Sequence, residues 1–199
     1  IAPHARMTRP KGTLMASQVV VSPDPLVSVI MTTFNSCDSV RNAIGSILAQ
    51  ERVRLELIVV DDASTDSTAD EVRAAIAGDS RARLVQLSAN RGTYWAKNVG
   101  IRESSGDLVT FMDSDDFSEP DRLVKQVDAI RQTPGAVAST CNYVRKNPAG
   151  EIVLNRGLAE RIALISLMAK RQVFSEVGYF DSVRTSADDE MLLRIKLAY

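Results

Sequence analysis

Apolar runs alternate with amphipathic stretches along most of the chain from residue 26 onward. The first run, residues 26–31, is mostly aliphatic and favours a buried strand. After it, apolar residues recur three and four positions apart between residues 40 and 48, which is the spacing of one helix face. This pattern predicts a strand followed by a helix, with Asp38 as the candidate N-cap of the helix.

The same alternation repeats three more times along the chain. Further strands are predicted at residues 55–60, 83–87 and 108–112. Further helices are predicted from about residue 66 to Gly78, over residues 93–103, and after Pro120. Strands that alternate with helices through short loops are typical of a mostly parallel sheet with helices on both faces. The sequence therefore predicts an α/β fold of this kind.

The pattern is less regular beyond Gly135. It predicts a fifth strand over residues 136–144, a turn at 147–150, a helix over about 158–169 and a last helix from near Ser186. Residues 1–25 are rich in proline, serine and basic residues and show no periodicity, so we interpret them as an extension or linker. The predicted domain spans residues 26–199, and we expect more protein to follow it.

Composition narrows the classes of function. The formal net charge of -1 and the aromatic content of 5% argue against a nucleic-acid-binding surface. The chain has two cysteines without close spacing and one histidine, His4, which argues against a zinc module and a Ser-His-Asp triad. No apolar run reaches about eighteen residues, so no membrane span is predicted.

Polar residues follow each of the first four predicted strands. In an open parallel sheet the carboxyl ends of the strands lie along one edge, where ligands bind. The residues that this rule brings together are Thr32, Thr33, Phe34 and Asn35, then residues 61–66, then Asn90 and Arg91, and then residues 113–116. The sequence therefore predicts one polar site at this edge.

Asp113 and Asp115 stand two positions apart, directly after the fourth apolar run. Two such carboxylates can share a Mg²⁺ or Mn²⁺ ion, which proteins usually bind through one or two carboxylates plus substrate phosphate oxygens. Arg91 and Lys97 could contact a diphosphate that completes the shell, although each also fits a solvated charge beside a helix. For residues 113–116, the alternative is an acidic turn that caps the next helix.

The start of the last predicted helix carries a second acidic group. Ser186 and Asp189 fit the two positions of a capping box, and acidic residues in a first turn favour the helix dipole. That account leaves Asp188 free to act as a general base on a hydroxyl. Both interpretations of this segment stay open from the residues alone.

Taken in order along the chain, these motifs resemble glycosyltransferase family 2, which comprises nucleotide-diphospho-sugar transferases of the GT-A fold. The matching segments are residues 27–35, 59–66, 90–92, 97–101, 111–116, 177–181 and 187–190. The resemblance implies a nucleotide-binding half and a smaller acceptor-side half. Bacterial capsule-type and polysaccharide-type enzymes are similar to this chain at the last segment.

The resemblance also implies roles for single residues. Thr32 and Phe34 would line the nucleoside pocket, and Asp62 would read the base, most often uracil in this family. Asp113 would lie near the ribose and Asp115 would hold the metal on the diphosphate. The remaining substrate-binding positions that match the family's motifs are Asn35, Arg91, Lys97, Asn98 and Asp116.

The implied reaction is a single displacement with inversion at the anomeric carbon, and Asp188 matches the catalytic base. The residue before that base is commonly acidic in the family, whereas here it is Ala187, which leaves the choice between Asp188 and Asp189 open. The expected partners are a UDP-sugar donor and a glycan or other hydroxyl acceptor. We expect a cytoplasmic protein, with the full-length form at the inner face of the membrane.

Three other classes of protein share parts of this pattern. A nucleotidyltransferase would normally carry a glycine-rich basic loop after the first strand, and this chain has residues 33–35 there instead. A phosphohydrolase would need its Asp-x-Asp motif after the first strand rather than the fourth. A non-catalytic nucleotide-sugar-binding domain would bind UDP with metal and transfer nothing, and a turnover assay separates it from an enzyme.

Overall fold

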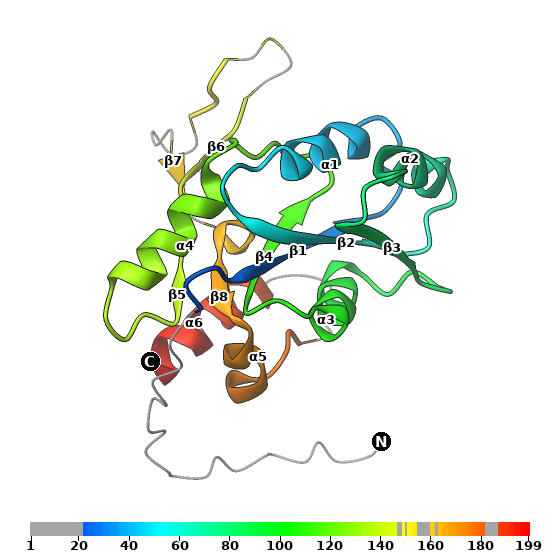
Figure 1. Cartoon of the computed structure of the whole chain (residues 1–199). Helices are drawn as coiled ribbons and strands as arrows, with labels where there is room; N and C mark the ends of the chain where they lie inside the picture. The colour runs from blue at the N-terminus through cyan, green and yellow to red at the C-terminus, as the bar shows by residue number, and fades with distance from the viewer. Residues whose placement is uncertain (1–21, 147–148, 150, 155–159, 162, 182–186) are drawn as a thin grey trace, which may run out of the picture.

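The computed structural model describes residues 22–146, 149, 151–154, 160–161, 163–181 and 187–199. Its centre is a six-stranded sheet in the order β3-β2-β1-β4-β8-β5, with helices on both faces (Figure 1). The strands of this sheet are β1 (Leu26–Thr33), β2 (Arg54–Asp61), β3 (Ala82–Gln86), β4 (Leu108–Asp113), β5 (Ala138–Ser139) and β8 (Met168–Lys170). A small second sheet pairs β6 (Tyr143–Val144) with β7 (Glu160–Arg161).

The helices alternate with the first strands, as the sequence predicts. They are α1 (Val40–Leu48), α2 (Thr68–Ile76), α3 (Thr93–Glu103), α4 (Arg122–Gln132), α5 (Arg171–Val177) and α6 (Ala187–Ala198), with a short 3-10 helix η1 (Leu164–Ser166) before β8. Helix α1 begins after Ser39 and has no side-chain cap, so the prediction of Asp38 as its N-cap was wrong. The predicted cap Ser186 lies outside the described residues.

Strands β1, β2, β3 and β4 are parallel and in register. Thr33 of β1 lies opposite Asp61 of β2, and Thr32 lies opposite Asp113 of β4. The carboxyl ends of three neighbouring strands therefore meet at one edge of the sheet. The predicted α/β fold with a mostly parallel sheet is confirmed.

Two apolar layers cover the sheet because neighbouring residues of a strand point to opposite faces. Val27, Val29 and Met31 of β1 pack in the core that includes residues of α1, α2 and α4. Ile30 packs in the core that includes residues of α3, α5 and α6. Figure 1 shows α1 and α2 on one side of the sheet and α3 on the other.

The second half of the chain departs from the prediction. The expected strand over residues 136–144 is divided between β5 and β6, which belong to different sheets. The helix expected over residues 158–169 was wrong, because this segment forms β7, η1 and the start of β8. A short apolar run fits a strand or a helix equally well, and here pairing with neighbouring strands determines that strands form. Strand β8 runs antiparallel to β4, with Met168 opposite Thr110, and covers an edge that would otherwise stay open.

Two further differences concern short elements. Helix α5 was not predicted, although Val173, Phe174 and Val177 stand at helical spacing, because its seven residues are too short a stretch for this pattern to be distinctive. The turn expected at residues 147–150 lies mostly outside the described residues, although Lys146 and Ile152 on either side of it form an antiparallel bridge.

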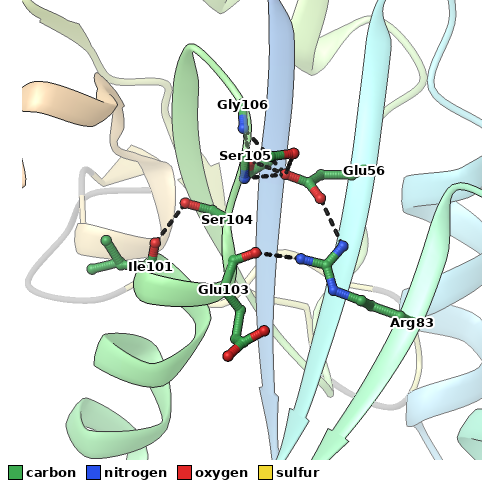
Figure 2. A network of polar contacts seen from close by, with 8 residues as sticks. Glu56, Arg83, Ile101, Glu103, Ser104, Ser105 and Gly106 are labelled. Atoms are coloured by element: carbon green, nitrogen blue, oxygen red, sulfur yellow. Dashed lines mark hydrogen bonds and ion pairs between the residues drawn. The ribbon is translucent and has the colours of Figure 1, made fainter.

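A buried glutamate holds the amino-terminal end of the sheet together (Figure 2). Glu56 Oε1 on β2 accepts hydrogen bonds from Ser28 Oγ on β1 at 2.6 Å and from the Ser105 amide before β4 at 2.7 Å. Its Oε2 accepts one from Arg83 Nη1 on β3 at 2.7 Å. One carboxylate therefore connects four successive segments of the sheet.

The turn before β4 fits this network because of Gly106. Its amide donates to Ser28 Oγ at 2.9 Å and to Glu56 Oε1 at 3.2 Å. A Cβ at this position would lie 2.5 Å from Ser28 Oγ and 2.7 Å from the carbonyl oxygen of Leu26. Only glycine therefore allows the turn to approach β1 this closely.

We predict that Glu56→Gln destabilises the protein at neutral pH and progressively less in acid. Burial on its own raises the pKa of Glu56, but hydrogen bonds from Ser28, Arg83 and Ser105 outweigh it and lower the pKa to about 2. Because the folded-state pKa lies below that of the unfolded chain, this stabilisation is present above about pH 4.5 and is lost as the pH falls toward 2.

The loss at pH 7 should be about 2–3 kcal/mol in free energy of unfolding, and it should shrink steadily below pH 4.5. Urea titrations at pH 7 and pH 3 measure both values. The exposed residue Glu119 supplies the control, Glu119→Gln, which should behave like the wild type. A difference that is the same at both pH values would contradict this account.

Candidate functional site

A cavity of about 590 Å³ opens at the carboxyl edge of the sheet. Its walls come from the loop after β1, the end of β2, the first turns of α3 and α6, and the loop after β4. The lining residues are Thr32, Thr33, Phe34, Asn35, Ser36, Asp38, Ser39, Asp62, Thr93, Lys97, Asp113, Ser114, Asp115 and Asp188. The structure therefore places most of the predicted site residues around one cavity.

Three predicted residues do not line this cavity. The side chain of Asn98 is buried, donates to the carbonyl of Phe180 and accepts from its amide, both at 2.9 Å. It therefore holds α3 to the segment before α6. The guanidinium of Arg91 stacks over the ring of Trp95, 4.8 Å from its centroid. Asp116 lies half-buried after Asp115, next to the cavity.

Asp62 holds the start of α3 in place. It is 3% exposed, and its two carboxylate oxygens accept the amides of Arg91 at 2.8 Å and Gly92 at 2.7 Å. Gly92 has φ 91°, in the left-handed region that favours glycine. Asp62 thus lines the cavity and also fixes the loop that leads into α3, a second role that its position in the sequence did not indicate.

A set of polar contacts fixes the loop that carries Phe34. The amide of Asn35 donates to Ser64 Oγ at 2.9 Å, and Asn35 Oδ1 accepts the amide of Thr65 at 2.8 Å. The amide of Ser36 donates to Thr68 Oγ1 at 2.7 Å. The loops after β1 and β2 therefore hold each other, and Phe34, which is 45% exposed, reaches the cavity from a fixed backbone.

Sequence reasoning did not identify Ser64 and Thr68 as supports of the site. A signal was available, because small hydroxyl residues after a strand commonly bind neighbouring backbone groups. Asn35 has φ 49°, and asparagine tolerates this left-handed conformation better than most residues.

Lys97 supplies a buried positive charge beside the acidic residues. Its side chain is 4% exposed, which rules out the solvated alternative for this residue. Its Nζ lies 3.2 Å from Asp113 Oδ1 and 3.1 Å from Thr93 Oγ1. A buried ammonium needs such partners because desolvation of an isolated charge is costly.

The acidic loop after β4 concentrates negative charge. Burial, and after it the charges of Asp113 and Asp115, raise the pKa of Asp116 to about 6, while Arg145 and Arg122 act in the opposite direction. Negative charges that destabilise one another in this way favour a bound cation. Asp115 is exposed at the cavity and Asp113 is half-buried, so both carboxylates are accessible to a ligand.

These residues fit a divalent cation that is shared with a ligand. In the part of the chain that the structure describes, no three His, Cys, Asp or Glu side chains form a metal site by themselves. Mg²⁺ and Mn²⁺ usually bind to one or two carboxylates and take further oxygens from substrate phosphates. Asp113 and Asp115 would be the protein's contribution to such a site.

Asp188 approaches the cavity from the first turn of α6. It is half-buried, and its Oδ1 is buried without a hydrogen-bond partner. Burial raises its pKa, and the charges of Asp113 and Asp189 add to this, whereas Lys97 and the Tyr94 hydroxyl lower it. A carboxylate that lines a cavity and has a raised pKa is well suited to accept a proton.

The neighbours of Asp188 on α6 face elsewhere. Asp189 is exposed and does not line the cavity. Glu190 accepts a hydrogen bond from Arg194 Nε at 2.8 Å, and Arg194 Nη1 donates to the carbonyls of Val177 at 3.1 Å and Tyr179 at 2.9 Å. Arg194 therefore holds α6 against the segment that follows α5.

The strand order, the helices on both faces and the acidic cavity at the carboxyl edge define a GT-A fold, as the sequence predicted. Residues 28–192 match the family described as "Glycosyl transferase family 2". The chain belongs to this family.

Several polysaccharide-biosynthesis proteins are similar to part of the chain. The succinoglycan biosynthesis protein ExoO of Rhizobium meliloti is 44% identical over 104 residues, which are 52% of this chain and 29% of that protein. The putative teichuronic acid biosynthesis glycosyltransferase TuaG of Bacillus subtilis is 36% identical over 116 residues, 58% of this chain and 46% of that protein. The chain spans less than half the length of these relatives.

A third relative is a glucosyltransferase. The UDP-Glc:alpha-D-GlcNAc-diphosphoundecaprenol beta-1,3-glucosyltransferase WfgD of Escherichia coli is 35% identical over 107 residues, 54% of this chain and 42% of that protein.

Solved structures show the same fold. The mannosyltransferase PcManGT from Pyrobaculum calidifontis, in complex with GDP-Man and Mn²⁺, superposes with a TM-score of 0.68 at 25% identity, over 88% of this chain and 54% of that one. S. aureus TarS 1-349 in complex with UDP-GlcNAc gives 0.70 at 21% identity, over 86% and 53%. Among the described residues, no helix combines the length and the apolar character that crossing a membrane requires.

Proposed function

We propose that the protein is an inverting glycosyltransferase that moves a sugar from a UDP-sugar to a hydroxyl of a glycan or related acceptor. The observation that carries this proposal is one shared cavity. Asp188 lines the same cavity as Asp113 and Asp115. A single displacement needs a base on the acceptor side and a diphosphate site on the donor side of one reacting carbon.

The donor end of the cavity suits a nucleoside diphosphate. Phe34 offers an aromatic face to a base, and Thr32 and Asp62 offer polar contacts at the same wall. Asp113 would lie near the ribose, and Asp115 would hold Mn²⁺ or Mg²⁺ on the diphosphate. The ligands of the solved relatives, UDP-GlcNAc in one and GDP-Man with Mn²⁺ in the other, support a donor of this class.

Charge on the leaving group is the main electrostatic demand of the reaction. A bound divalent cation would stabilise the leaving group by neutralising negative charge on the diphosphate. The buried Lys97 ammonium, fixed between Thr93 and Asp113, supplies a second positive charge that does not have to reorganise during the reaction. Arg91 would be a further phosphate contact at the edge of the site.

At the acceptor end, Asp188 accepts the proton of the attacking hydroxyl. The hydroxyl oxygen forms its bond to the anomeric carbon while the bond from that carbon to the diphosphate oxygen breaks. Burial, which raises the pKa of Asp188, brings the carboxylate closer to the range in which a general base works well at neutral pH. Attack on the face opposite the leaving group inverts the anomeric configuration.

The names of several relatives support a role in polysaccharide or glycoconjugate biosynthesis. They refer to succinoglycan, teichuronic acid and a lipid-linked diphosphate sugar. In this proposal the acceptor is therefore a growing glycan, and the full-length protein works at the cytoplasmic face of the membrane, where such lipid-linked acceptors would be available.

We predict that UDP binding depends on metal and on Asp115. Calorimetric titration of UDP into the wild type should give binding in MnCl₂ that is lost in EDTA, because the carboxylates and the diphosphate must share the ion. Asp115→Ala should weaken binding in MnCl₂ by at least about tenfold, or about 1.4 kcal/mol. Asp70→Ala, a change at a surface carboxylate of α2, is the matched control. Absence of binding to UDP and to other nucleotides would sink the proposed function.

We further predict that Asp188→Asn reduces transfer by about 10²–10⁴-fold, because the amide cannot accept the acceptor's proton. The affinity for UDP in MnCl₂ should stay within about twofold of the wild type, since Asp188 lies on the acceptor side. Release of UDP from UDP-sugars in the presence of glycan acceptors measures turnover.

Asp189→Asn is the control for this prediction and should remain active. An active Asp188→Asn with an inactive Asp189→Asn would assign the base to the next residue. Tight metal-dependent UDP binding without any turnover by the wild type would instead indicate a non-catalytic nucleotide-sugar-binding domain.

A further inference from the structure

Four polar side chains from three elements are joined by hydrogen bonds along the cavity. Thr32 Oγ1 on β1 lies 3.0 Å from Thr93 Oγ1 on α3. Thr93 Oγ1 accepts from Lys97 Nζ at 3.1 Å, and the same ammonium donates to Asp113 Oδ1 on β4 at 3.2 Å. All four residues line the cavity, so these contacts connect β1, α3 and β4 at the site itself.

Thr93 holds the central position in this series of contacts. It is the first residue of α3, and Lys97 follows four positions later, so both side chains lie on the same face of the helix. An ammonium has donors and no acceptor, so Thr93 Oγ1 must be the acceptor in this contact. The second contact of Thr93, to Thr32, joins α3 to β1. The Thr93 hydroxyl therefore fixes the Lys97 ammonium and is itself fixed by β1.

In the part of the chain that the structure describes, three groups surround the Lys97 ammonium, and they respond differently to a bound cation. Asp113 is one of the two carboxylates that would hold the divalent cation, which would neutralise this carboxylate and repel the ammonium. The centroid of the Tyr94 ring lies 5.9 Å from Nζ, near the outer limit of a cation–π contact. Thr93 is a neutral hydroxyl at 3.1 Å, so it is the close partner that remains.

We propose that Thr93 is a positioning residue, whose hydroxyl keeps the Lys97 ammonium at the donor end of the cavity when a divalent cation occupies Asp113. The inference rests on the proposed function, because it requires a diphosphate and a cation at this end. A lysine side chain is flexible, and without this anchor its charge would be free to move away from the diphosphate. Thr93 thus acts on the donor through Lys97 and needs no contact of its own to the donor.

Two other roles of Thr93 would change donor affinity in the same direction. Thr93 is exposed at the cavity, so its hydroxyl could contact the donor directly. It could also act through Thr32, with which it shares a hydrogen bond. Both of these effects would persist in a protein without the Lys97 charge, whereas an effect through Lys97 would disappear.

A double-mutant cycle separates these roles. Thr93→Val removes the hydroxyl and keeps a β-branched side chain at the start of α3, and Lys97→Met removes the charge and keeps an unbranched side chain. Calorimetric titration of UDP in saturating MnCl₂ gives Kd for the wild type, both single variants and the double variant. Each variant is first shown to be folded by its circular dichroism and melting temperature, and Lys97→Gln replaces Lys97→Met if the latter does not fold.

Two further variants serve as controls. Thr93→Ser keeps the hydroxyl, so it should restore the contact that Thr93→Val loses. Thr133→Val removes the hydroxyl of an exposed threonine at the end of α4, outside the cavity. Both variants should bind UDP within about twofold of the wild type, because neither changes the anchor of Lys97.

We expect Thr93→Val to weaken UDP binding about fivefold and Lys97→Met about twentyfold, in the range of a hydrogen bond to a charged group. The double variant should bind within about twofold of Lys97→Met alone. Independent effects would instead multiply to a loss of about a hundredfold.

A double variant about a hundredfold weaker than the wild type would overturn the proposal, because Thr93 would then act without Lys97. An unchanged affinity in Thr93→Val would overturn it as well. Both results leave the proposed function standing, since the wild type binds UDP in each. A wild type that binds no nucleotide would overturn both ideas, whereas one that shows the expected coupling but transfers no sugar would keep the role of Thr93 and lose the transferase activity.

Discussion

The register of β1 between β2 and β4 underlies the geometry of the cavity and of the loops around it. It sets Thr32 opposite Asp113 and Thr33 opposite Asp61, so that residues distant in the sequence share one edge. A slip by one residue would exchange the two faces of a strand and expose its apolar side chains. The Glu56 carboxylate connects the same strands at their other end, so the two ends of the sheet hold the register together.

The site combines loops that are fixed by hydrogen bonds with carboxylates that repel one another. The side chains of Asp62, Asn35 and Asn98 form hydrogen bonds with backbone amides and carbonyls, which fixes the loops around the cavity. Burial and the charges of Asp113 and Asp115 instead raise the pKa of Asp116. Burial and the charge of Asp113 likewise raise the pKa of Asp188, with Lys97 as the buried counter-charge. This arrangement lowers the stability of the empty site and favours a ligand that brings positive charge, which is consistent with a cation shared with a diphosphate.

Much of the first half of the fold could be predicted, because its signals are local. Helix α3 has the predicted bounds Thr93–Glu103, and the first four strands differ from prediction by only one or two residues at their ends. The second half could not be predicted equally well. Met168 pairs with Thr110, 58 positions earlier, and no local periodicity records such a partner. The same limit applies to Asn98, whose partner Phe180 is 82 residues away.

Local patterns in the chain were enough to identify the class of the protein and its candidate chemistry. Its apolar periods define the alternating strands and helices, and its ordered acidic motifs define the family, since both are properties of neighbouring residues. The fold, in contrast, sets which side chains share the cavity. It turned Asp188 inward and Asp189 outward, buried Lys97 against Asp113, and brought Thr93 to the end of β1. Those facts depend on packing between elements far apart in the chain, and packing is a property of the fold rather than of any segment.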